Sequence, residues 1–257
     1  MREVIQFIPL ATTILALCFA VALSKRWRAR GGRHLLWFAV GALTYAAGTI
    51  TESWTTLFGW NESVFRAWYI TGALMGGAPL AQGAVYLHLR RRTADGFAVA
   101  LVVAIATASA FVLASPLRYE LVVSNHLTGK VLAWTWVRAF SPFINGYALL
   151  FLVGGAAASA RHFSRSREMR HRFVGNTLIA VGALLPGIGG TFTRFGHTEV
   201  LYVTEFIGLA LICVGYRFTI TPFVDCVDLP RPGTRESPGT VPRAAGRLGG
   251  VAARARG

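Results

Sequence analysis

Residues 44–89, TYAAGTITESWTTLFGWNESVFRAWYITGALMGGAPLAQGAVYLHL, decide the fold of this chain. They form two apolar segments joined by a short polar turn. Glu52 lies near the end of the first segment, and glycine, proline and glutamine lie inside the second. Helices that are apolar apart from one acidic residue, with glycine and proline in their interior, are typical of a lipid bilayer.

The composition of the whole chain supports the same class. Of the 257 residues only 14% are charged, against roughly 25% in a soluble domain. A membrane-spanning helix needs about 20 mostly apolar residues. We therefore predict an all-α fold, a polytopic bundle of seven transmembrane helices embedded in the lipid bilayer. The predicted spans are residues 4–24, 35–57, 67–89, 97–114, 142–160, 173–192 and 201–220.

Residues 221–257 differ from the rest of the chain. They are rich in proline, glycine and arginine and poor in large apolar residues. Such a segment cannot bury enough apolar surface to fold alone. We therefore expect a seven-helix domain over residues 1–220, followed by a disordered basic tail in the cytoplasm.

The basic residues predict how the bundle is oriented. The net charge of +15 does not indicate a nucleic-acid partner, because lysine and arginine lie at the ends of apolar segments rather than on one face. With the N-terminus outside and the C-terminus in the cytoplasm, the inner segments hold 20 of the 26 basic residues. This arrangement satisfies the positive-inside rule.

Two carboxylates fall inside predicted spans, where a charge is costly and therefore a candidate for function. Glu52 and Glu205 both lie near the outer ends of their spans. They indicate an outward-facing polar cavity for a small molecule, ion or proton. The alternative is a structural ion pair or an interfacial glutamate. The other residues expected around the cavity are Arg66 and His197 as charge partners and Trp54, Trp68 and Tyr202 as rim aromatics.

The third span contains residues that shape a helix. Gly72 and Gly76 form a small-xxx-small pair that lets helices approach closely. Pro79 removes a backbone donor near mid-membrane, and Gln82 and Tyr86 can form hydrogen bonds across helices. Broken helices of this kind line binding sites in transporters, although they are also ordinary packing devices.

The sixth span has the same ambiguity at Pro186 and Gly187, where we expect a kink. Pro79 and Pro186 lie in matching spans of two triplets. A small proton-coupled transporter that uses these prolines as hinges is therefore an alternative function.

The longest predicted outer connection, residues 115–140, has strand-like residues on both sides of a possible turn. It predicts either an external hairpin or an interfacial segment anchored by Trp134 and Trp136, because tryptophan favours the headgroup level.

The histidines and lysines argue against several cofactors. No pair of histidines has a haem or metal spacing within one span, and both lysines lie outside the spans, which excludes a retinal Schiff base. We expect no cofactor and no metal. His34 and His88, near the cytoplasmic boundary, would serve a lipid-modifying enzyme, and an assembly scaffold that binds its partner through the tail is a further alternative.

Residues 65–87, FRAWYITGALMGGAPLAQGAVYL, resemble a family of bacterial seven-helix integral membrane proteins with no assigned activity. The architecture is more loosely similar to the seven-helix input modules of bacterial sensors, without their kinase or cyclase domain. The resemblance implies a multi-pass protein of the bacterial inner membrane. Our leading hypothesis is a receptor-like protein that binds a ligand and is not an enzyme.

Overall fold

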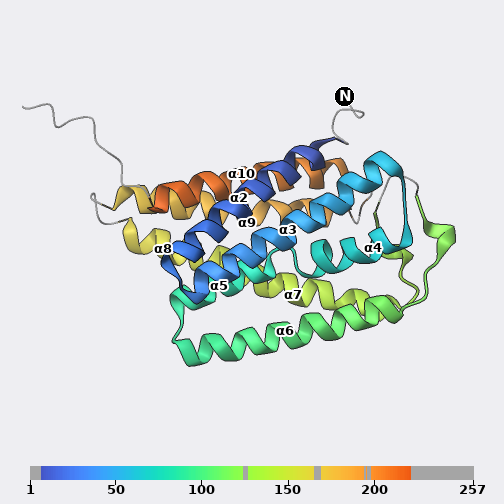
Figure 1. Cartoon of the computed structure of the whole chain (residues 1–257), viewed down its shortest axis with the longest axis horizontal. Helices are drawn as coiled ribbons and strands as arrows, with labels where there is room; N and C mark the ends of the chain where they lie inside the picture. Colours follow the sequence, from blue (N-terminus) through green and yellow to red (C-terminus); the bar gives the residue numbers. More distant parts are fainter. Residues whose placement is uncertain (1–6, 124–126, 165–168, 194, 196–197, 221–257) are drawn as a thin grey trace, which may run out of the picture. The chain divides into compact units, whose positions relative to one another are not determined.

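The computed structural model describes residues 7–123, 127–164, 169–193, 195 and 198–220. Over this part of the chain the fold is an all-α bundle of seven helices, two of them interrupted (Figure 1). Six are long and apolar enough to cross a membrane, which confirms a multi-pass helical protein. The predicted sidedness stays a prediction. The uninterrupted helices are α2 (Ile8–Arg30), α3 (Arg33–Phe58), α6 (Arg91–Ala114), α9 (Arg170–Thr193) and α10 (Thr198–Ile220).

The helix that is not among the six is the third, because it is broken in the middle. It consists of α4 (Glu62–Trp68), a π-helical turn η1 (Tyr69–Leu74), a turn at residues 75–77, and α5 (Ala78–His88). The break precedes Pro79, which lies in the first turn of α5. There the missing proline N–H has no helical partner to lose.

The fifth membrane helix is also irregular and starts earlier than expected. It runs through η4 (Thr135–Ala139), α7 (Phe140–Ala148), a π-helical turn η5 (Leu149–Val153) and α8 (Gly154–Phe163). The predicted start at residue 142 is therefore too late. The Ser141 hydroxyl donates to the backbone carbonyl of Ala73, 2.9 Å away, and so ties this helix to the break in the third.

Two tight turns define the ends of the bundle. Gly31 and Gly32 connect α2 to α3 at φ values of 66° and 97°, and Gly59 connects α3 to α4 at 83°. Side chains with a Cβ rarely adopt these values. We call the end of the bundle at Gly31 and Gly32 the α2–α3 end, which is predicted to be cytoplasmic. The end at Gly59 is the α3–α4 end, which is predicted to lie outside.

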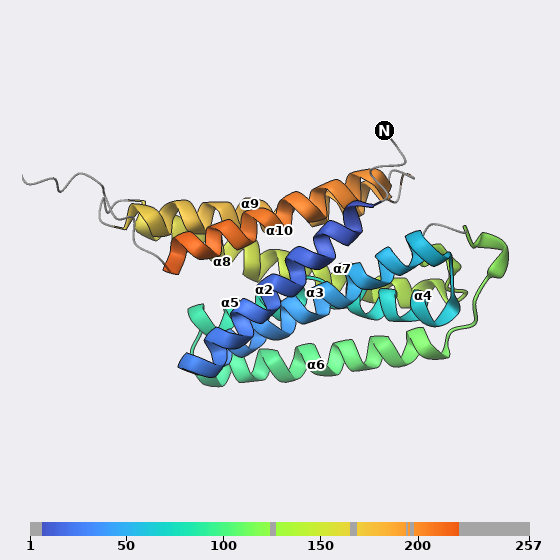
Figure 2. The same cartoon turned by 45° about the horizontal axis from the view of Figure 1, so that its top comes forward.

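Helices α9 and α10 pack backbone against backbone and lie side by side (Figure 2). A Cβ added at Gly182 would lie 2.5 Å from the Gly208 carbonyl oxygen, and one at Gly215 would lie 2.6 Å from that of Gly175. These glycines recur every seven residues along each helix, so they form one continuous seam. Close glycine contacts of this kind drive helix association in membranes, where lipid supplies no hydrophobic force.

The connection after α6 is built mainly from short 3-10 turns, and its two arms pair over one antiparallel bridge. It contains η2 (Tyr119–Leu121) and η3 (Gly129–Val131), and its only described strand-like pairing is one bridge between Leu117 and Leu132. Leu132 is fully buried in a cluster with Phe65 of α4. The connection therefore packs onto the α3–α4 end, and Trp134 and Trp136 stack on one another there.

Candidate functional site

The fold brings together the two carboxylates that the sequence singles out. Glu52 of α3 is buried, at 5% exposed. Its Oε1 accepts a hydrogen bond from Trp68 Nε1 at 2.9 Å. The Glu205 carboxyl of α10 lies next to it, within electrostatic range. Residues 153 positions apart thus meet inside the bundle.

Small and aromatic residues allow this meeting. A Cβ on Gly48 would lie 3.1 Å from Gly72 Cα, so α3 and η1 approach closely and Trp68 reaches Glu52. The Tyr45 hydroxyl donates to the backbone carbonyl of Glu205 at 3.3 Å. Both Tyr45 and Gly48 lie on the same face of α3 as Glu52, as their spacing predicts. Tyr202 is buried and lies within electrostatic range of both carboxyl groups.

The pair lacks a complete set of hydrogen-bond donors. Oε2 of Glu52 is buried and has no hydrogen-bond partner among the described residues. Over the same part of the chain, neither carboxylate forms an ion pair with lysine, arginine or histidine. Two ionised carboxylates can only accept hydrogen bonds, so neither can satisfy the other.

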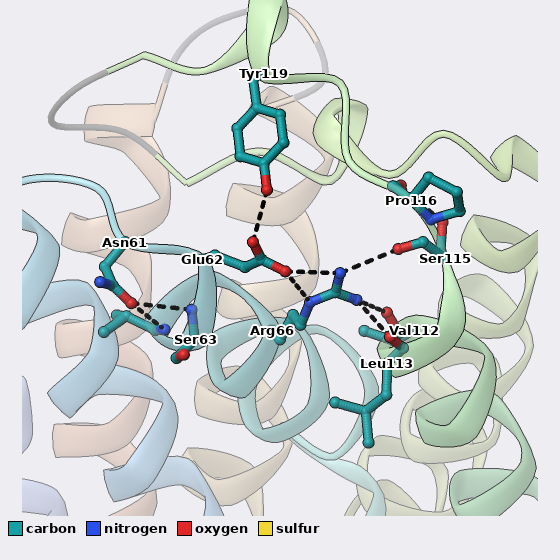
Figure 3. A network of polar contacts seen from close by, with 10 residues as sticks. Asn61, Glu62, Ser63, Arg66, Val112, Leu113, Ser115, Pro116 and Tyr119 are labelled. Carbon is teal, nitrogen blue, oxygen red and sulfur yellow. Dashed lines mark hydrogen bonds and ion pairs between the residues drawn. The ribbon is translucent and has the colours of Figure 1, made fainter.

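Arg66 lies elsewhere, which corrects the expectation that it pairs with Glu52 or Glu205. Its Nε donates to Glu62 Oε1 at 3.0 Å, and its Nη2 donates to the Ser115 carbonyl at 3.1 Å (Figure 3). Its Nη1 donates to the carbonyls of Val112 and Leu113. Arg66 therefore caps the C-terminal end of α6, where carbonyls lack helical donors.

Glu62 completes the set of polar contacts around Arg66 at the α3–α4 end, which we call the clasp. Its Oε2 accepts a hydrogen bond from the Tyr119 hydroxyl at 2.6 Å. The hydrogen bonds from Tyr119 and then Arg66 hold the pKa of Glu62 below its usual value of 4.5. The same contact raises the pKa of Tyr119. The clasp joins α4, the end of α6 and the connection that follows.

Two further residues expected around the cavity, Trp54 and His197, are not found in contact with the carboxyl pair. Trp54 is about half exposed, and its ring packs on Phe58 with centroids 4.6 Å apart. No described contact joins it to the carboxyl pair. His197 lies outside the described residues.

Gln82 and Tyr86 form the cross-helix hydrogen bonds that the sequence predicts. Gln82 is fully buried, and its Nε2 donates to the Ala94 carbonyl of α6 at 2.9 Å. Its Oε1 accepts from the Tyr147 hydroxyl of α7. Tyr86 donates to Asp95 Oδ1 at 2.6 Å, and Arg33 pairs with the same carboxylate. These contacts hold α5, the part of the third helix that follows the break, against α6 and α7.

The other helix-shaping residues differ in what they contact. Gly76 N–H donates to the Gly72 carbonyl at 3.1 Å, within the interrupted stretch. Pro186 lies inside α9, which continues past it, and its ring packs against Gly208 of α10. A Cβ on Gly187 would meet nothing within 4 Å.

The fold defines a multi-pass helical membrane protein in which buried Glu52 lies next to partly buried Glu205 near the α3–α4 end. Comparison with protein-family models, with curated proteins and with solved structures finds no match. The function is therefore argued from the site, and the family resemblance of residues 65–87 stays a prediction.

Proposed function

We propose that this membrane protein binds a proton or a small cation between Glu52 and Glu205, entering from the α3–α4 end. The supporting observation is that two carboxyl groups from separate helices meet inside the bundle with no described basic partner. Glu52 lies six residues before the end of α3, about 9 Å along the helix axis. The site is thus within reach of the predicted outer surface.

Electrostatics gives the reason for this choice of ligand. Two adjacent carboxylates in an apolar interior repel one another strongly and are poorly solvated. A single proton turns one carboxyl into a donor and supplies the partner that Glu52 Oε2 lacks. A small cation between the two would satisfy the same oxygens. Either ligand fits a receptor-like protein that senses the outer medium.

The broken third helix favours transport as a second candidate function. Trp68, the donor to Glu52, is the last residue of α4 and adjoins the π-helical turn. A shift at this break would withdraw its N–H from Glu52 and change the affinity of the pair for a proton. Interrupted helices next to an ionisable group are a common element of proton-coupled transporters.

The direct test compares wild type with the Glu52→Gln/Glu205→Gln double variant in nanodiscs. We expect the wild type to show the infrared carbonyl band of a protonated carboxyl group, and the double variant to lose it. We also expect the thermal midpoint of the wild type to depend on pH or on the monovalent cation supplied. A ligand at a hundredfold excess over its Kd stabilises by about 2.7 kcal/mol.

An Asp95→Asn variant serves as the control, because Asp95 is paired with Arg33 and should remain ionised. The proposal fails if the band is absent from the wild type and both proteins respond equally to pH and cations. Reconstitution into vesicles with a pH gradient and candidate solutes then separates the two functions. A transporter moves protons in a manner that depends on Glu205, whereas a receptor moves none.

A further inference from the structure

A second polar feature lies at the opposite end of the bundle from the carboxyl pair. A cavity of about 610 Å³ opens among α2, α3, α5, α8, α9 and α10. His34 lines it at the start of α3, 18 residues before Glu52, which is about 27 Å along the helix. The cavity is therefore separate from the carboxyl site, and its size is within the ordinary range of ligand pockets, about 300–1,000 Å³.

The cavity is lined by basic residues and adjoins a buried hydroxyl group that has no described partner. Arg26 and Arg30 of α2 and Arg172 of α9 line it. The guanidinium carbon of Arg26 lies 5.7 Å from the ring centroid of Tyr216. The Tyr216 hydroxyl is buried without a hydrogen-bond partner among the described residues. Within the same residues no carboxylate forms an ion pair with these arginines, since the ion pairs found there are at Arg33 and Arg66.

The wall of the cavity is apolar. Phe19 and Leu23 of α2 continue from the arginines along the helix, and Leu80 of α5 and Ile212 of α10 face the same space. A ligand that matches this surface has a negative headgroup and a hydrocarbon portion. A free anion would leave the apolar wall unused, and an uncharged lipid would leave the arginines unpaired.

Of the two histidines that line the cavity, His88 is already hydrogen-bonded within the protein. His88 Nδ1 lies 2.8 Å from the Ala84 carbonyl, and its Nε2 lies 3.0 Å from Ser159 Oγ. With both ring nitrogens hydrogen-bonded, His88 is a positioning residue for this wall.

We propose that this cavity binds an anionic phospholipid of the cytoplasmic leaflet. Its phosphate would lie between Arg26 and Arg30 and accept a hydrogen bond from the Tyr216 hydroxyl, and an acyl chain would follow Phe19 and Leu23. Arginine is suited to this contact because its planar fork donates two hydrogen bonds to a phosphate. Basic pockets between membrane helices at the cytoplasmic side recognise anionic headgroups in the same way.

Native mass spectrometry of the purified protein, titrated with an anionic and a zwitterionic phospholipid of the same chains, tests the proposal. We expect the wild type to retain the anionic lipid preferentially. The Arg26→Gln/Arg30→Gln variant should bind it about tenfold more weakly, because charge-assisted hydrogen bonds are lost. Tyr216→Phe should show a smaller loss.

The matched control is Lys25→Gln/Arg28→Gln, which removes the same charge from the same helix at residues that do not line the cavity. It should bind the anionic lipid as the wild type does. An equal loss in both double variants would mean a diffuse surface charge effect and would overturn the site. Competition by inorganic phosphate as strong as by the lipid would also overturn it, since a phospholipid site needs the acyl contacts.

Discussion

A Gly182→Leu variant should fail to pair its last two membrane helices and should lose more than about 3 kcal/mol of stability. A Cβ at this position would lie 2.5 Å from the Gly208 carbonyl oxygen and 3.0 Å from Leu211 Cβ. The obstacle is backbone, which cannot rotate away as a side chain can. Overpacking of a tight contact costs about 1–3 kcal/mol even where side chains can move. Size-exclusion chromatography in detergent and the thermal midpoint measure the loss.

Gly187→Leu is the matched control for this prediction. Gly187 lies five residues further along α9 and has no neighbour within 4 Å of an added Cβ. The same substitution there should leave the elution profile and midpoint close to wild type. If both variants behave alike, the seam does not hold α9 to α10.

An Arg66→Met variant should lose about 3 kcal/mol of stability, because one guanidinium joins α4 to the end of α6. Its side chain is largely buried, at 17% exposed, and it donates to three backbone carbonyls and to Glu62. Hydrogen bonds to a charged group contribute roughly 1.5–3 kcal/mol each. Arg66→Lys should recover only part of the loss, because lysine lacks the fork that reaches several acceptors.

Glu62 adds a pH dependence to this clasp. Since its pKa is lowered in the folded protein, its contribution is present above the ordinary pKa of 4.5 and is lost as the pH falls through the folded value. A Glu62→Gln variant should therefore be less stable than wild type near neutral pH, and the difference should shrink in acid. Arg118→Met removes an exposed arginine of the same connection. It should change neither the stability near neutral pH nor the dependence of stability on pH. A constant difference at all pH values would assign the effect of Glu62 to packing.

The helical class could be predicted from the sequence, and the two carboxylates could be singled out as candidates. Hydropathy identified the six helices that are long and apolar enough to cross a membrane, because each needs a long apolar run. Glu52 and Glu205 could be recognised because a charge inside such a run is conspicuous. Trp68, expected at the rim, reaches Glu52 because the close contact of Gly48 with Gly72 brings α3 and η1 together. Tyr202, also expected at the rim, lies one turn before Glu205 on α10.

The partners of Arg66 could not be predicted, because depth in the membrane is only one of the coordinates that bring side chains together. Arg66 lies at the expected level but faces α6, and its acceptors at Val112, Leu113 and Ser115 are backbone carbonyls with no sequence signature. Tyr147 was missed for the same reason. Its contact with Gln82 spans 65 positions and depends on which helices are neighbours.

The interruption of the third helix has a consequence for how the chain enters the membrane. Helix α5 has 11 residues, a length of about 16 Å, whereas the hydrocarbon core is about 30 Å thick. Neither α5 nor the stretch formed by α4 and η1 is therefore long enough to cross the hydrocarbon core alone. The Ser141 hydroxyl, two helices later in synthesis, donates to the Ala73 carbonyl at the break, so we expect the third helix to become stable in lipid only after the fifth has been made.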